Sequence, residues 1–244
     1  MANGVRLIPR EIREAGFPIA RFLSEEEQAR YEEAFKKFSG KAGDSLRVGR
    51  NGSNLWKVLF LNQIGIRTAS LGELESALEN GFALQGQYED GVEVVLRSAG
   101  DSYKSNDYLA RGLAKILGIK TFKSPLVVKG LRIKEDESSD YGLGFEKTDK
   151  TEVIEAPDLS HRNYQRRFLR INPDYSIEFD DKAGRTLWTR EDGMSGLYLD
   201  RGLGLNSRFE YLADSDDYGR VVVVNSAEGV QNELMPAGMT ITNY

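Results

Sequence analysis

The chain has 244 residues, enough for one large domain or two small ones, and 40% of them are hydrophobic, so a sizeable core can form. The net charge is -5, and the basic residues form no block along the sequence. Both features argue against nucleic acid or an anionic membrane surface as a partner. The absence of cysteine excludes disulfides, thiolate metal sites and cysteine nucleophiles.

Three segments carry helix signals, at residues 24–38, 70–80 and 107–117. The first two begin with a serine that is followed three residues later by a glutamate. In this capping box each side chain satisfies a free backbone amide of the first turn. Apolar residues at helical spacing predict that one face of each segment lies in the core. Gly40 and Gly118 predict where the first and third helices end.

Strand-like periodicity is found in six runs: 56–61, 92–97, 126–133, 153–155, 176–179 and 185–189. Asp90 with Gly91 predicts a tight hairpin, and residues 180–184 predict a short hairpin link between the last two runs. The polar segments 134–141 and 163–173 have little periodicity and predict surface loops.

The organisation of the chain is simple, because helices precede strands and neither a linker nor a repeat divides it. We therefore expect residues 1–244 to form one α+β domain. Residues 1–19 hold two prolines, several charges and no apolar signal region, and no run approaches the roughly 18 apolar residues of a membrane span. We expect neither a secretory leader nor a membrane span, with the protein cytoplasmic by default or carried to a surface or virion by another route.

Residues for catalysis or metal binding are scarce. His161 is the single histidine, and no G-x-S-x-G or H-E-x-x-H motif accompanies it, so we expect an exposed or loop-fixing side chain. Gly202 with Gly204 lacks the third glycine of a dinucleotide site. The acidic stretch 214–217 suggests calcium, but its spacing does not match an EF-hand loop, which favours a solvated acidic loop. We predict no catalytic residue, no metal and no cofactor.

Residues 193–224 contain a regular apolar frame. Leu197 alternates with Leu199, and Leu203 with Leu205, as expected for strands with one buried face. The opposite face then carries Tyr198, Asp200, Gly204 and Asn206. The four consecutive valines at 221–224 lack alternation, which predicts a strand buried on both faces.

The polar positions of this region have the composition of a binding surface. Rigid aromatic side chains that offer contact area at little entropic cost stand among aspartate, asparagine, serine and arginine: Tyr198, Phe209, Tyr211 and Tyr218. An ordinary sheet edge with exposed loops has the same appearance, because single exposed aromatics are common on protein surfaces.

A longer pattern carries a resemblance to a known family. From Gly193 the chain fits GxSxLYLxxxLxLxSxxxxLAxSxxxGRVVVV, and this motif resembles the variable repeat of archaeal diversity-generating-retroelement variable proteins. Upstream segments also resemble the constant part of that family: 94–98, 101–103, 124–128, 141–143 and 152–160. The similarity runs from about Val92 onward, and the first fifty residues match no family.

The resemblance implies a C-type lectin fold of the retroelement and formylglycine-generating-enzyme class. It implies an N-terminal helical extension at about 1–50 and a variable region at about 195–225. In that family a reverse transcriptase makes errors at template adenines, so AAC codons come to encode many residues, but not Lys, Gln, Glu, Met or Trp. The implied ligand-binding positions hold reachable residues: Gly196, Tyr198, Asp200, Arg201, Gly202, Gly204, Asn206, Arg208, Phe209, Tyr211, Asp214, Asp216, Asp217 and Tyr218. Glu210 is not reachable, so it is either constant or out of register.

The family function implies a binding module without catalysis, whose partner is an unknown macromolecule, either a protein or a glycan. Gly219 and Arg220 are then scaffold, a turn glycine and a positioning charge. One alternative is a structural virion or cell-surface component, in which this face only packs against a neighbour. An enzyme on the related formylglycine-generating fold is a weaker alternative, because its chemistry depends on cysteine and this chain has none.

Overall fold

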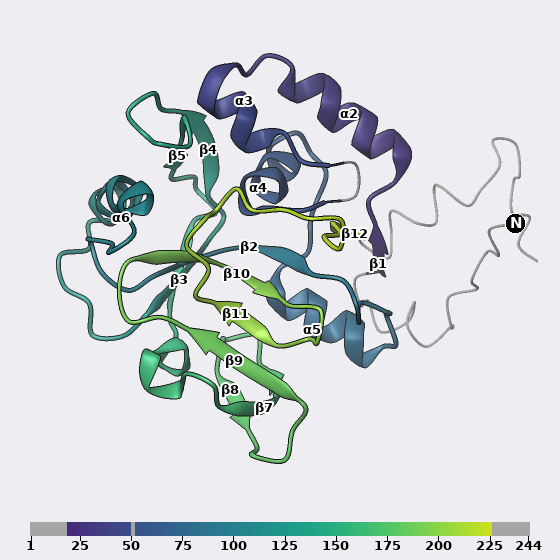
Figure 1. The fold of residues 1–244 in the computed structure, drawn as a ribbon, viewed down its shortest axis with the longest axis vertical. Coiled ribbons are helices and arrows are strands. Elements are labelled where there is room, and N and C mark those ends of the chain that lie inside the picture. Colours follow the sequence, from purple (N-terminus) through teal and green to yellow (C-terminus); the bar gives the residue numbers. More distant parts are fainter. Residues whose placement is uncertain (1–18, 50–51, 226–244) are drawn as a thin grey trace, which may run out of the picture.

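The helices of the computed structural model come early in the chain and most of its strands come late (Figure 1). The structure describes residues 19–49 and 52–225, so the part of the expected N-terminal extension before residue 19 lies outside the described residues. The helices are α2 (Glu25–Phe35), α3 (Gly40–Leu46), α4 (Leu55–Gln63), α5 (Leu71–Glu79) and α6 (Lys104–Leu117), with short 3-10 turns η1 (Pro157–Leu159) and η2 (His161–Asn163). The α+β class predicted from the sequence is thereby confirmed.

The eight-stranded sheet has the order β6-β3-β2-β10-β11-β9-β7-β8, and it curls toward its β8 end (Figure 1). Its strands are β2 (Glu89–Leu96), β3 (Leu126–Lys129), β6 (Glu152–Glu155), β7 (Arg167–Ile171), β8 (Ile177–Phe179), β9 (Arg185–Thr189), β10 (Met194–Leu199) and β11 (Leu205–Ser207). Neighbours are antiparallel except β11 and β9, which run parallel. Two small antiparallel sheets pair β1 (Ile19–Phe22) with β12 (Val222–Asn225) and β4 (Arg132–Glu135) with β5 (Leu143–Glu146).

The core consists of two hydrophobic clusters on opposite faces of the sheet. On β2, Val94 contributes to the first cluster, with α4 and α6, and Val95 to the second, with α5 and the curled end of the sheet. The predicted valine strand divides in the same way, since Val223 belongs to the first cluster and Val222 to the second. The prediction of a strand buried on both faces is confirmed, because 221–224 are all buried.

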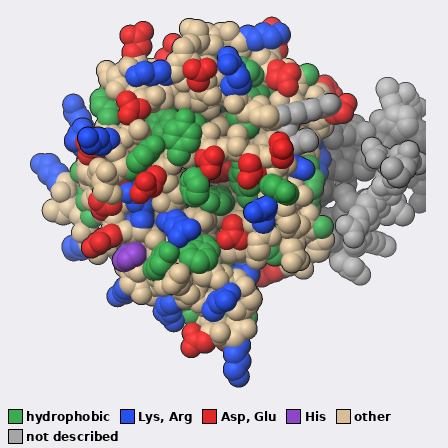
Figure 2. Space-filling view, viewed as in Figure 1, with side chains coloured by type: hydrophobic (Ala, Val, Ile, Leu, Met, Phe, Trp, Pro, Cys, Tyr) green, Lys and Arg blue, Asp and Glu red, His purple; other side chains and the backbone are tan. Residues whose placement is uncertain are grey.

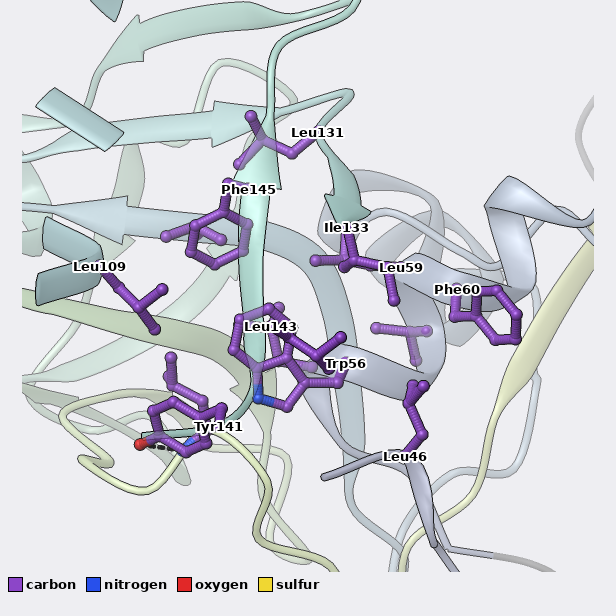
Figure 3. Packing of buried hydrophobic residues seen from close by; sticks show 14 of the residues in the cluster. Leu46, Trp56, Leu59, Phe60, Leu109, Leu131, Ile133, Tyr141, Leu143 and Phe145 are labelled. Carbon is purple, nitrogen blue, oxygen red and sulfur yellow. Dashed lines mark hydrogen bonds between the residues drawn. The ribbon is translucent and has the colours of Figure 1, made fainter. Parts of the chain in front are cut away.

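The sequence interpretation of residues 56–61 as a strand is wrong, because they lie in α4. Asn54 caps this helix by accepting a hydrogen bond from the amide of Lys57 at 2.8 Å. Every residue from Leu55 to Leu61 is buried, so the run has no polar face to reveal its helical period. Figure 3 shows the reason, with Trp56 enclosed by side chains from α3, α6, β4 and β5.

Further local predictions need correction. Asp90 and Gly91 lie inside β2 instead of forming a hairpin. The run 126–133 is divided between β3 and β4 by Gly130, whose φ of 72° only glycine adopts readily. The expected loop 163–173 contains β7, which pairs with both β8 and β9, so residues 180–184 do not close a hairpin between those two strands. Part of the expected loop 134–141 belongs to β4, and α3 was not predicted.

The predicted starts of two helices are confirmed. Both expected capping boxes are present, Ser24 with Glu27 and Ser70 with Glu73. Gly118 ends α6 in the left-handed conformation, with a φ of 72°. None of the helices in the described residues combines the length and the apolarity that a membrane crossing requires.

Candidate ligand-binding site

The region expected to vary begins on β10, in the middle of the eight-stranded sheet. β10 pairs with β2 on one side and with β11 on the other. Leu197, Leu199 and Leu205 are fully buried in the second core cluster, which confirms the alternation predicted for the apolar frame. Leu203 differs, because it lies in the turn before β11 with a φ of 64° and is only partly buried.

A cavity of about 200 Å³ opens between β10, the start of β2, the first residue of α4 and the loop before β12. Figure 2 shows acidic side chains gathered among hydrophobic ones near the middle of the face that β10 and β11 occupy in Figure 1. Eight of the fourteen expected ligand-binding positions line the cavity: Gly196, Tyr198, Asp200, Arg201, Phe209, Tyr211, Asp214 and Asp216. The other lining residues are Leu55, Tyr88, Asp90 and Leu212.

Aromatic rings form one side of this cavity. The ring of Tyr198 meets Tyr88 edge-on at 6.0 Å and Phe209 at 6.2 Å between centroids. Tyr211 packs on the buried Tyr141 at 5.6 Å and leaves half of its surface exposed. Rings that are anchored in this way offer contact area to a ligand while losing little side-chain entropy.

Carboxylates also line the cavity, and Asp90 is the most deeply placed of them, at 9% exposure. Its Oδ2 accepts a hydrogen bond from the Ser53 hydroxyl at 2.9 Å. Burial raises the pKa of Asp90 to about 7, and the Ser53 hydrogen bond limits the rise. The pKa of Asp214 is also raised, by burial first and by the neighbouring charge of Asp216 second.

The loop that closes the cavity is held by residues other than the expected ligand-binding positions. The hydroxyl of Tyr88 donates to the carbonyl of Ser53 at 3.0 Å and accepts from the amide of Asp216 at 2.8 Å. A Cβ on Gly219 would lie 2.7 Å from the Tyr88 ring, so only glycine permits this approach. Arg220 donates to two loop carbonyls, which agrees with its expected positioning role.

Six expected ligand-binding positions do not line the cavity: Gly202, Gly204, Asn206, Arg208, Asp217 and Tyr218. Two of them are buried, which corrects the expectation of an open face at Gly204 and Asn206. A Cβ on Gly204 would lie 2.8 Å from the carbonyl oxygen of Thr186, so this position cannot take a larger side chain without a backbone shift. The Asn206 side chain instead accepts a hydrogen bond from the amide of Arg208 at 3.2 Å.

Two arginines stack on rings beside the cavity. The guanidinium of Arg201 lies 4.4 Å from the ring centroid of Tyr218, and that of Arg208 lies 4.8 Å from the centroid of Trp188. Arg208 also donates to the hydroxyl of Tyr164 at 2.9 Å. Arg208 therefore extends the surface along β9, away from the cavity.

His161 and Glu210 each contact other residues of the protein. His161 is exposed, as predicted, and stacks on the ring of Tyr164 at 5.4 Å. The backbone carbonyl of Glu210 accepts a hydrogen bond from Asn106 at 2.7 Å, and its carboxylate lies 4.0 Å from the guanidinium of Arg190. Glu210 does not line the cavity, which fits the interpretation of a constant position.

Comparison with protein-family models, curated proteins and solved structures finds no match for this chain. Within the described residues no group of three or more histidine or acidic side chains is placed to hold a metal ion. The contributions of Tyr88 and Asp90 to the cavity were missed by sequence reasoning. They lie more than a hundred residues before β10, and no local signal marks them.

The raised pKa of Asp90 leads to a pH-dependent stability. The folded state keeps a proton on Asp90 that the unfolded state releases near its ordinary pKa of 3.8, so folding loses stability as pH rises from about 4 to about 7. We expect Asp90→Asn to remove this loss and to raise the urea midpoint more at pH 8 than at pH 4. Glu89 and Glu93 act in the same direction, so the comparison is variant against parent at each pH. An equal midpoint shift at both pH values would contradict the assignment.

Proposed function

We propose that this protein is a non-catalytic binding protein in which residues 196–218 form a diversified contact surface for a macromolecular ligand on a C-type lectin scaffold. The observation that carries the proposal is the convergence of eight expected variable positions on one cavity. These positions are distributed over β10, the turn that follows it and the loop before β12. Their convergence in space is what a shared binding site requires.

The separation of buried frame from exposed contact positions supports this proposal. Leu197 and Leu199 are fully buried, whereas Phe209 and Tyr211 keep 42% and 51% of their surface exposed. Substitution of exposed residues usually changes stability by about 0.5 kcal/mol or less. A surface built in this way can change its contact residues while its fold persists.

Gly196 shows how far the contact surface can be remodelled. A Cβ built on Gly196 would approach no atom closer than the Leu55 Cβ at 4.0 Å. A large side chain there would enter the cavity without a clash at its Cβ. The shape of the site can therefore be altered from this single position.

The architecture is compatible with the proposed fold class. Helices come first, a curled sheet follows, and the strand that ends the variable region pairs with the first strand. An ordinary structural surface is the competing interpretation, because it needs the same buried frame but no variation.

Sequencing the 3′ end of the gene across a population distinguishes these two interpretations. We expect substitutions to be confined to the exposed positions of 196–218, with the frame leucines, Glu210 and Gly219 unchanged. We also expect a near-copy of the segment encoding residues 195–225 beside a reverse-transcriptase gene. Uniform clones without such a copy would overturn the proposal.

A further inference from the structure

The cavity is unusual in its charge, because four aspartates line it together with a single cation, Arg201. None of these aspartates forms an ion pair with a lysine or arginine of the described chain: Asp90, Asp200, Asp214 and Asp216. Arg201 stacks on Tyr218 instead. Within the described residues, the cavity therefore contains four aspartates and no cation that pairs with them.

Asp90 adds a second observation that points to a ligand. It is about nine-tenths buried, at 9% exposure, and it lines the cavity. Its Oδ2 is held by Ser53, whereas its Oδ1 accepts no hydrogen bond from any residue in the described part of the chain. Oδ1 of Asp90 can therefore accept a hydrogen bond from a bound group.

The aromatic rings at the cavity indicate which chemical group can bind there. The rings of Tyr88, Tyr198 and Phe209 adjoin one another at the cavity. Tyrosine and phenylalanine faces attract organic cations, and carboxylates accept their N–H donors. A planar guanidinium satisfies both at once, because it stacks on rings and donates to carboxylates through a fixed fork.

We propose that this cavity binds an arginine side chain presented by a protein partner, with Asp90 as the acceptor at its base and Tyr88, Tyr198 and Phe209 as its wall. The proposal rests on the proposed function and specifies the partner, since a neutral glycan does not supply the positive charge. Tyr88 and Asp90 lie outside residues 195–225, so their contribution to the preference for a cation belongs to the constant part of the site.

A pair of isosteric probes tests this assignment. Nα-acetyl-arginine amide and Nα-acetyl-citrulline amide have nearly the same shape, but only the first is charged. In a titration of the full-length protein followed by amide chemical shifts, we expect the arginine probe to shift the signals of Tyr198 and Asp214. Its Kd should be at least about tenfold lower than that of the citrulline probe, which corresponds to one charge-assisted contact.

Three variants locate the site. Asp90→Asn and Asp214→Asn should each raise the Kd of the arginine probe by about fivefold or more through the loss of a carboxylate. Asp214 is exposed, so its variant tests the site even if Asp90→Asn fails to fold. Asp181→Asn is the matched control, because Asp181 is an exposed aspartate between β8 and β9 that does not line the cavity, and it should leave the Kd within about twofold.

Several outcomes would overturn the assignment. These are equal binding of the two probes, absence of shifts at the cavity, or equal effects of Asp214→Asn and Asp181→Asn. Shifts caused by a neutral methyl glycoside, but not by the arginine probe, would assign the face to a glycan. Diversified genes without arginine binding would leave the proposed function intact, whereas arginine binding with uniform genes would remove only the diversification.

Discussion

Replacing Trp56 with alanine is expected to lower the free energy of unfolding by about 3–5 kcal/mol, the usual cost of removing a fully buried large aromatic side chain. Trp56 is fully buried, stacks on Phe145 at 5.1 Å and contacts Tyr141 at 5.6 Å. The hydroxyl of Tyr141 in turn accepts a hydrogen bond from the amide of Leu212 at 3.3 Å. The cavity left by the variant would therefore loosen the support of the binding loop as well as the core.

The second tryptophan offers a matched control. Trp188 is only partly buried and contacts Arg208 and Tyr164 on the surface. We expect Trp188→Ala to cost less than half as much as Trp56→Ala in urea unfolding followed by circular dichroism. Equal losses for the two variants would contradict the central position of Trp56 in the core.

The second large expected effect is a difference in unfolding free energy between substitutions in the apolar frame and substitutions at the exposed positions. We expect Leu199→Ala to cost about 2–5 kcal/mol of unfolding free energy, because it removes a fully buried side chain from the second core cluster. Phe209→Ala removes a larger side chain that is 42% exposed, and we expect a change of only about 0.5 kcal/mol.

Chemical denaturation of the parent and both variants measures this difference. A loss for Phe209→Ala as large as that for Leu199→Ala would mean that the contact residues hold the fold. The surface could not then be exchanged freely. Phe209→Tyr is the conservative control, since it keeps the ring and adds only a hydroxyl at an exposed position.

Sequence reasoning succeeded where the structural signal is local. The capping box of Ser24 and Glu27 needs only the first turn of α2, and the alternation of Leu197 and Leu199 needs only one strand. It failed for α4, because a helix buried on all sides has the same apolar run as a buried strand. It also failed for β7, whose two buried residues, Phe168 and Ile171, are three positions apart and do not show the alternation of a strand.

The same contrast between local and nonlocal signals applies to the candidate site. The positions on β10 and in the following loops were found because they belong to one continuous pattern. Tyr88 and Asp90 were missed because their place in the cavity depends on the pairing of β2 with β10, and no local sequence pattern predicts this pairing. Gly204 and Asn206 were expected on an open face, but both are buried. Their burial depends on neighbouring parts of the chain, which is also a nonlocal property.

The pairing of β1 with β12 has a consequence for chains whose sequence changes within residues 196–218. Val222 and Val224 belong to the second core cluster, and their strand is the only partner of β1 in its sheet within the described residues. A chain that stops or shifts its reading frame inside residues 196–218 lacks this strand. Its first strand stays unpaired and its core remains open. Completion of the fold therefore requires translation in frame through the whole of residues 196–218.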